Sequence, residues 1–282
     1  MAKNKRFGVI NVVAQPHPEG TYRKVFEAAG ALTEGVNFFG DSYARLSPPS
    51  REKTGVFRGR LAVWMEIDQS EPIIFKGSLE QALLADTDFN VPSEVGFNSK
   101  IFFYPFREHD HTFFIELEND EGGSISVNRA VDALNAIFER ISLPGIESID
   151  AYVKTERFAV DRVLSIPTLR KVEIVINIPN PDDLQDDIAA VYREMVIMGA
   201  KQQKAEITKS RDAETLTLSP RYLALANVAK DTGFVKTEGF AADGSKQELS
   251  TREHPQIIDA VQENDVNAYR LVLRVASGNP DD

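Results

Sequence analysis

The sequence predicts an α+β protein with mainly antiparallel sheets and packed helices. Segments typical of strands and of helices alternate along the chain, but short turns separate several strand pairs, which favours β-hairpins over parallel βαβ units. No sequence period of 20–50 residues repeats, so a solenoid or propeller is not expected. The length of 282 residues suits two domains, and we place an N-terminal α+β domain over 1–158 and a C-terminal α+β domain over 159–282.

The N-terminal half opens with an apolar segment, residues 7–13, whose β-branched side chains predict a buried strand. Thr21 is expected to cap a helix that runs to about Leu32, because apolar side chains recur within it at helical spacing. The Ser-Pro-Pro-Ser segment at 47–50 predicts a loop, since adjacent prolines cannot lie in a central strand. The stretch 55–68 that follows is typical of a strand.

The clearest hairpin lies in the middle of the chain. Residues 100–106 and 112–118 are aromatic and aliphatic strands, and the polar segment 108–111 is the turn between them. Ser126 or Asn128 then caps a helix whose apolar residues recur every three or four positions.

The C-terminal half shows the same alternation. Residues 169–178 form a run of strong β propensity, and the acidic segment after Pro179 suits the positive end of a helix dipole. The elements expected beyond it are a helix carrying Leu184 to Met195, a strand at 204–208, a helix at 220–228 and a hairpin of 233–239 with 245–251.

Composition excludes several kinds of site. The chain has no cysteine, which rules out disulfides, iron–sulfur clusters, cysteine zinc sites and a thiolate nucleophile. No apolar run approaches the ~20 residues that span a bilayer, and the N-terminus lacks a signal-peptide block, so we expect a cytoplasmic protein without membrane contact. P-loop, Rossmann and nucleophile-elbow motifs are missing. We therefore expect no cofactor and favour a non-enzymatic function.

One local cluster offers an enzymatic alternative. On a strand, His109 and His111 would face the same side and could share a divalent metal with Glu108 or Asp110, as in a metal-dependent nuclease. A turn also gathers polar residues for solvation alone, and no third ligand stands at a recognisable spacing. We assign no metal ligands here.

Charge is distributed unevenly along the chain. The net charge is −11, yet residues 1–64 carry ten basic and five acidic side chains, a balance of +5 that leaves −16 for the rest. Two basic runs can pair with phosphates without reading base sequence, and Phe57 and Trp64 beside the first could stack on a base. The alternative is that both runs are ordinary solvated surface. The candidate nucleic-acid-binding residues are Arg51, Lys53, Arg58, Arg60, Lys201, Lys204, Lys209 and Arg211.

Several turn and strand motifs follow one another along most of the chain. They are Val9-Ile10-Asn11-Val12, His17-Pro18-Glu19-Gly20, Ala44-Arg45-Leu46, Gly59-Arg60-Leu61, Phe102-Phe103-Tyr104-Pro105, His111-Thr112-Phe113-Phe114-Ile115, Ile176-Asn177-Ile178-Pro179-Asn180-Pro181 and Ser250-Thr251-Arg252-Glu253-His254-Pro255. In this order they resemble an uncharacterised bacterial and phage family, a domain of unknown function. More distantly, the two-unit layout is similar to the lambda phage-exclusion protein RexA, a two-domain dimer associated with DNA binding and abortive infection. This resemblance implies a phage-defence role and a symmetric dimer.

These observations together give one expected function. We expect a non-enzymatic, homodimeric component of a phage-defence system of the abortive-infection type, which binds nucleic acid non-specifically or a protein partner encoded nearby. An acidic partner-binding subunit without nucleic-acid contact and the metal-dependent nuclease are the alternatives.

Overall fold

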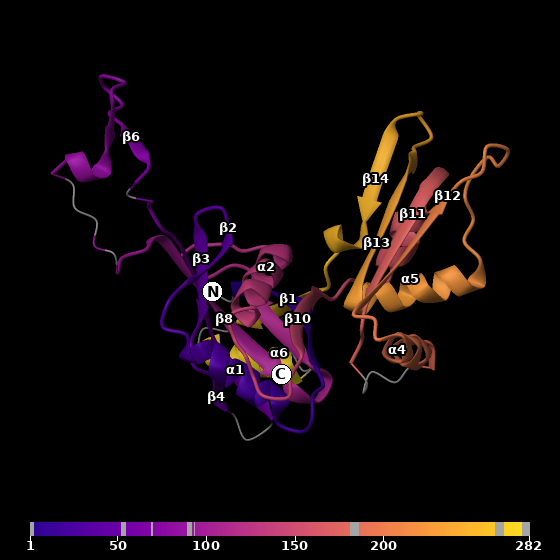
Figure 1. Cartoon of the computed structure of the whole chain (residues 1–282), viewed down its shortest axis with the longest axis horizontal. Coiled ribbons are helices and arrows are strands. Elements are labelled where there is room, and N and C mark those ends of the chain that lie inside the picture. The colour runs from indigo at the N-terminus through magenta and orange to yellow at the C-terminus, as the bar shows by residue number, and fades with distance from the viewer. Residues whose placement is uncertain are drawn as a thin grey trace.

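The computed structural model describes residues 3–51, 55–68, 70–88, 92, 94–180, 186–262 and 268–277. A large sheet with its helices forms the body of the molecule, a smaller sheet stands beside it, and an arm projects from the opposite side of the body (Figure 1). All pairs between the described strands are antiparallel, which confirms the α+β prediction.

The helices and strands that the sequence predicts are present, together with others that it does not predict, such as those at 148–153, 159–164, 257–262 and 268–277. The strands are β1 (Lys3–Gln15), β2 (Val36–Phe39), β3 (Ser42–Leu46), β4 (Ser50–Arg51), β5 (Val56–Met65), β6 (Pro72–Ile74), β7 (Gln81–Leu83), β8 (Phe97–Arg107), β9 (Thr112–Glu116), β10 (Ser148–Val153), β11 (Thr168–Asn177), β12 (Gln202–Thr208), β13 (Gly233–Phe240), β14 (Lys246–Ser250) and β15 (Ile257–Gln262). The helices are α1 (Thr21–Ala31), α2 (Val127–Phe138), α3 (Ala159–Leu164), α4 (Asp186–Met198), α5 (Pro220–Thr232) and α6 (Ala268–Ser277), with short 3₁₀ turns η1 (Leu84–Asp86), η2 (Glu108–Asp110) and η3 (Thr251–Glu253).

The large sheet is nine-stranded, in the order β10-β1-β9-β8-β5-β3-β2, with β15 paired to β1 and β4 paired to β5. Strand β1 is longer than the predicted segment 7–13, because its first half pairs with β15 and its second half with β10. Apolar residues occupy both faces of β1, so it is buried on both sides.

Helices cover both faces of this sheet. Side chains of α1 and α2, among them Phe26 and Leu134, pack with Phe102 and Phe113 in the main core. On the other side α6 packs against Phe7 and neighbouring residues in a smaller core. The sheet therefore has α1 and α2 on one face and α6 on the other.

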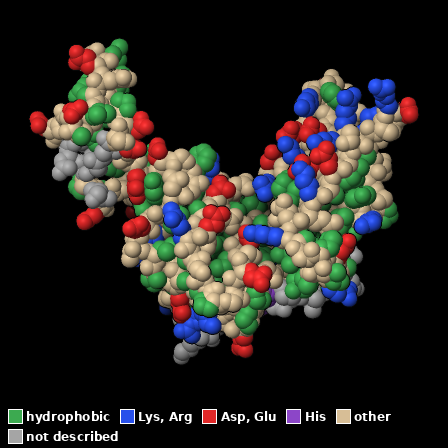
Figure 2. Space-filling model, in the orientation of Figure 1, with side chains coloured by type: hydrophobic (Ala, Val, Ile, Leu, Met, Phe, Trp, Pro, Cys, Tyr) green, Lys and Arg blue, Asp and Glu red, His purple; other side chains and the backbone are tan. Residues whose placement is uncertain are grey.

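The smaller sheet is four-stranded, in the order β12-β11-β13-β14, and its apolar face packs on α4 and α5. Each of its strands carries a lysine and a glutamate two positions apart, so that the charges share one face. Cross-strand ion pairs link them: Lys171–Glu206 at 3.2 Å, Lys204–Glu173 at 3.1 Å and Lys236–Glu248 at 2.6 Å. Figure 2 shows these mixed charges on the smaller sheet.

Both predicted hairpins are confirmed, as β8–β9 and β13–β14. The predicted cap at Ser126 is also confirmed, because its hydroxyl accepts a hydrogen bond from the Arg129 backbone N–H at 3.2 Å. The predicted cap at Thr21 is wrong: Gly20 precedes the helix in the left-handed region (φ +78°). The Thr21 hydroxyl instead donates to the Pro18 carbonyl at 2.7 Å.

The end of the chain returns to the large sheet. Strand β15 pairs with β1, and α6 packs beside it, although both lie after residue 158. Hydrogen bonds also join the halves, as where the Asn180 side chain donates to the Val12 carbonyl at 3.2 Å and accepts from the Tyr22 hydroxyl at 3.0 Å. The division at residue 158 stays a prediction. Every helix in the described ranges is too short or too polar to cross a membrane.

Candidate nucleic-acid interface

One face of the β3–β5 ladder carries the candidate interface. In β3, Ala44 and Leu46 point into the core, so Tyr43 and Arg45 point outward. The register places Tyr43 opposite Trp64 and Arg45 opposite Ala62, and Arg60 follows on the same face of β5. Strand alternation alone therefore gathers two arginines and two aromatic rings on one surface.

This surface forms the floor of a cavity of about 1040 Å³. Its walls are the loop after α1, the chain after β3, the chain leading into β8, and Arg140 just beyond α2. The lining residues that matter here are Tyr43, Arg45, Arg60, Trp64 and Arg140, with Glu34, Glu66 and Glu94.

Three arginines give the cavity its basic character. Arg45 is half-buried and donates through Nη1 to the Thr33 carbonyl at 3.3 Å, whereas Arg60 and Arg140 are exposed. Among the described residues, none accepts a hydrogen bond from the buried Arg45 Nε. The guanidinium groups that line the cavity suit an oxyanion ligand, because planar N–H groups match phosphate and carboxylate oxygens.

Two glycines pack closely against the Trp64 ring. A Cβ atom on Gly35 would lie 2.2 Å from the Trp64 Cζ2, and one on Gly96 would lie 2.0 Å from its Cδ1. The indole Nε1 donates to Glu66 Oε1 at 3.1 Å. The ring is therefore fixed while it remains half-buried at the cavity wall.

Replacing Gly35 or Gly96 by alanine should displace the indole. Because the added methyl group has no room, we expect each variant to lose about 1–3 kcal/mol of unfolding free energy. Gly77→Ala is the control, since no heavy atom lies within 4 Å of the added Cβ. Urea denaturation followed by fluorescence of the chain's single tryptophan measures all three. An unchanged midpoint in both tight variants would contradict this packing.

Three carboxylates balance the three arginines. Glu34, Glu66 and Glu94 lie on the wall, and Glu66 is bound to the indole. This arrangement disfavours a ligand of uniformly high negative charge density. It suits one that offers phosphates to the arginines and polar or apolar groups elsewhere.

The first predicted basic run is only partly brought together. Arg60 lines the cavity. Arg58 lies on the same strand, and its Nε donates to the Ser50 hydroxyl at 3.1 Å. Arg51 ends β4, of which the structure describes the backbone, and Lys53 lies outside the described residues.

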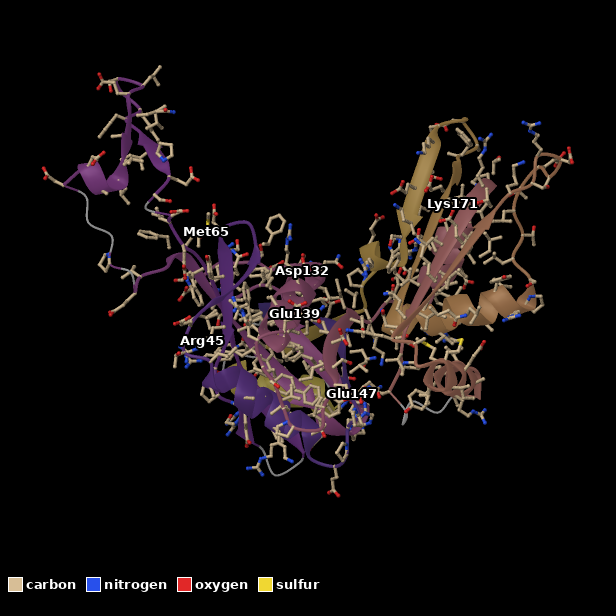
Figure 3. All side chains as sticks on the ribbon, in the orientation of Figure 1. Arg45, Met65, Asp132, Glu139, Glu147 and Lys171 are labelled. Atoms are coloured by element: carbon tan, nitrogen blue, oxygen red, sulfur yellow. The ribbon has the colours of Figure 1, made fainter. Side chains whose placement is uncertain are left out.

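The second predicted run lies elsewhere and is largely engaged with protein groups. Lys201 pairs with Asp150 at 3.0 Å and Lys204 with Glu173 at 3.1 Å, while Lys209 donates to the Ser210 carbonyl at 2.8 Å. Arg211 is exposed. Figure 3 shows Arg45 and Lys171, one on each sheet, on opposite sides of the view. Among the described residues, Arg58 and Arg60 of the first run thus lie on the large sheet, and Lys204 of the second lies on the smaller sheet.

The histidine turn does not have the predicted geometry. His111 follows η2 in the left-handed conformation (φ +55°), so His109 and His111 do not alternate as on a strand. His109 is exposed, whereas His111 is buried and its ring stacks on that of Tyr22, with 4.5 Å between the ring centroids. Burial opposes ionisation of Asp110, but two hydrogen bonds from Arg107 hold its pKa below the usual value. Within the described ranges no cluster of three His, Asp or Glu side chains is arranged to hold a metal.

Sequence reasoning missed Arg45, Arg140 and Tyr43. Arg45 and Tyr43 had a signal in the sequence, because they alternate with the apolar residues Ala44 and Leu46 on one strand. Arg140 has no such signal, because only the packing of α2 brings it to the cavity.

Comparison with known protein families shows to which family the chain belongs. A family model described as Domain of unknown function (DUF4747) matches residues 3–277. The chain belongs to the DUF4747 family. The predicted resemblance to a family of unknown function is thereby confirmed. No curated protein matches this DUF4747 chain.

Proposed function

We propose that this DUF4747 protein binds single-stranded nucleic acid in the cavity formed by Arg45, Arg60, Arg140 and Trp64. The observation that carries the proposal is the placement of three arginines around a fixed, half-buried indole. Arginines bind phosphates irrespective of sequence, and an aromatic ring stacks on any unpaired base.

A single strand fits this cavity better than a duplex. The bases of a duplex already stack on one another, so an indole has no base face to contact. The carboxylates on the wall and the net charge of −11 also oppose the dense charge of a duplex. Flexible unpaired nucleotides can place phosphates at the arginines and keep the remaining backbone away from the glutamates.

Binding should be weak and strongly salt-dependent. If three phosphates of a single strand are neutralised, the logarithm of affinity falls with log salt at a slope of about −2, so a rise from about 50 to 200 mM salt lowers affinity roughly 20-fold. Fluorescence anisotropy of labelled oligouridylate and oligothymidylate measures this slope. No binding at about 50 mM salt would end the nucleic-acid proposal and favour the protein-partner alternative.

We further propose that this binding serves phage defence and that the protein acts as a symmetric dimer without catalysis of its own. The defence role rests on the expectation drawn from the sequence layout alone, the one on which the similarity to RexA was stated. A host expressing the protein with its neighbouring genes should plate phage less efficiently, and the triple variant Arg45→Ala, Arg60→Ala and Arg140→Ala should restore plating. Equal protection by the variant would separate defence from the cavity.

A further inference from the structure

The loop between α1 and β2 places a carboxylate between an arginine and the indole of the cavity. Its residues Thr33, Glu34 and Gly35 all line the cavity. The Thr33 carbonyl accepts a hydrogen bond from Arg45 Nη1 at 3.3 Å. On the other side of Glu34, Gly35 packs against the Trp64 ring, where an added Cβ would lie 2.2 Å from Cζ2. The residue before Glu34 therefore touches the arginine, and the residue after it touches the indole.

A nucleotide has its parts in the same order. Its sugar lies between its base and its phosphate, so a base stacked on Trp64 with its phosphate at Arg45 brings the sugar to Glu34. Arg45 can hold a phosphate while it binds the loop, because a guanidinium offers five N–H donors and the bond to Thr33 uses one of them. The order of groups along the cavity wall thus matches the order of groups in one nucleotide.

The chemistry of Glu34 distinguishes two kinds of sugar. An ionised carboxylate only accepts hydrogen bonds. Within a DNA strand the phosphates and the deoxyribose oxygens are also acceptors, so a carboxylate beside this backbone gains no hydrogen bond and is repelled. Each nucleotide within an RNA strand carries a 2′-hydroxyl that can donate. Glu34 therefore opposes DNA and suits RNA.

We infer that the cavity binds single-stranded RNA in preference to single-stranded DNA, because the Glu34 carboxylate accepts a hydrogen bond from a ribose 2′-hydroxyl. This inference rests on the proposed nucleic-acid binding and names the class of strand that the same site takes. The hydroxyl is present whatever the base, so the sequence tolerance expected of the arginines and the indole is kept. Glu34 is exposed at the cavity wall, so a strand can reach its carboxylate.

Three labelled strands of equal length isolate the contribution of the sugar. They are oligouridylate, the matching deoxyuridylate, and a 2′-fluoro strand, which keeps a ribose-like sugar conformation but cannot donate a hydrogen bond. All three carry the same base, so a difference between them comes from the sugar. At about 50 mM salt, wild type should bind oligouridylate roughly 10-fold more tightly than either other strand, as one hydrogen bond to a charged group provides. Fluorescence anisotropy measures the three dissociation constants.

Variants of Glu34 test the contact itself. Glu34→Ala removes the acceptor and should bring the affinities for oligouridylate and deoxyuridylate close to equality. Glu34→Gln keeps a neutral acceptor and should give an intermediate preference, because charge-assisted hydrogen bonds are the stronger ones. Glu94→Ala is the matched control: it removes the same charge from another part of the wall, so it should strengthen binding of all three strands alike and keep the preference. Both glutamates are exposed, so folding should be preserved.

The outcomes separate this inference from the proposed function. Equal binding of the three strands by wild type would overturn the ribose preference and leave single-strand binding in place. A 2′-fluoro strand that binds as tightly as oligouridylate would overturn the hydrogen bond, since the preference would then reflect sugar conformation. An unchanged preference in Glu34→Ala, or an equal loss of it in Glu94→Ala, would overturn the role of Glu34. If wild type binds none of the strands, the proposed function and this inference are both wrong.

Discussion

Replacing Glu116 by glutamine should lower the free energy of unfolding by about 1–3 kcal/mol, because Lys5 loses the nearer of its two carboxylate partners and keeps only Asp120, at 3.0 Å. Lys5 Nζ lies 2.6 Å from Glu116 Oε1, and their side chains are 6% and 4% exposed. The other Glu116 oxygen accepts from the Phe103 backbone N–H at 3.1 Å. The pair thereby links β1, β9 and β8 inside the large sheet.

Three measurements define this result. Urea denaturation should give the loss for Glu116→Gln, while Lys5→Met/Glu116→Gln should recover much of it, since the lysine charge is removed and the glutamine still accepts from the Phe103 N–H. Glu118→Gln is the control, because Glu118 is 63% exposed and meets Arg6 only at 3.9 Å. A loss below about 1 kcal/mol for Glu116→Gln would contradict the account of a buried ion pair.

The pH dependence of this cluster follows from two shifted groups. Burial alone would lower the pKa of Lys5, but hydrogen bonds to Glu116 and Asp120 raise it above its ordinary value. The stabilisation from Lys5 is therefore complete at neutral pH and lost as pH rises past that raised pKa. The Lys5 hydrogen bond lowers the pKa of Asp120, so that contribution is lost on acidification below about pH 4.

The triple variant Arg45→Ala, Arg60→Ala and Arg140→Ala should bind single strands roughly 10²–10³-fold more weakly at about 50 mM salt. This corresponds to about 1–1.5 kcal/mol for each lost charge-assisted hydrogen bond. The salt slope should flatten in parallel, because the released counterions are those at the three contacted phosphates. Anisotropy of labelled oligouridylate measures both quantities.

A matched variant makes this prediction specific. The triple variant Lys204→Ala, Lys209→Ala and Arg211→Ala also removes three positive charges, but from the second predicted basic run. In that run Lys204 already pairs with Glu173. Its affinity should stay within a few-fold of wild type. Equal losses in the two triple variants would show that net charge alone governs binding.

The sequence predicted most of the fold and little of the site. Segments such as 169–178 and the hairpin around 108–111 depend on local propensity and alternation, which a single sequence displays. The return of β15 to β1 does not, because that pairing joins residues separated by most of the chain. The same limit explains the site. Arg60 was found as part of a charge run, but Arg140 reaches the cavity only through tertiary packing.

A run of basic residues in the sequence does not show which of them are available to bind phosphate. Lys201 and Lys204 form a basic cluster in sequence, yet each has a carboxylate partner: Asp150 on β10 of the large sheet for Lys201, and Glu173 on the neighbouring strand for Lys204. Whether a lysine is available to bind phosphate depends on which carboxylate lies beside it. Strand pairing and tertiary packing decide that, and neither can be read from the charge run.

The most direct test of the cavity proposal is the emission of Trp64, the chain's single tryptophan and a residue of the cavity wall. Unlabelled oligothymidylate should be titrated into wild type at about 50 mM salt, alongside anisotropy of the labelled strand. The account predicts saturable quenching with the same dissociation constant in both measurements, because a base stacks on the indole. Binding by anisotropy with unchanged Trp64 emission would contradict it, since the strand would then lie elsewhere on the protein.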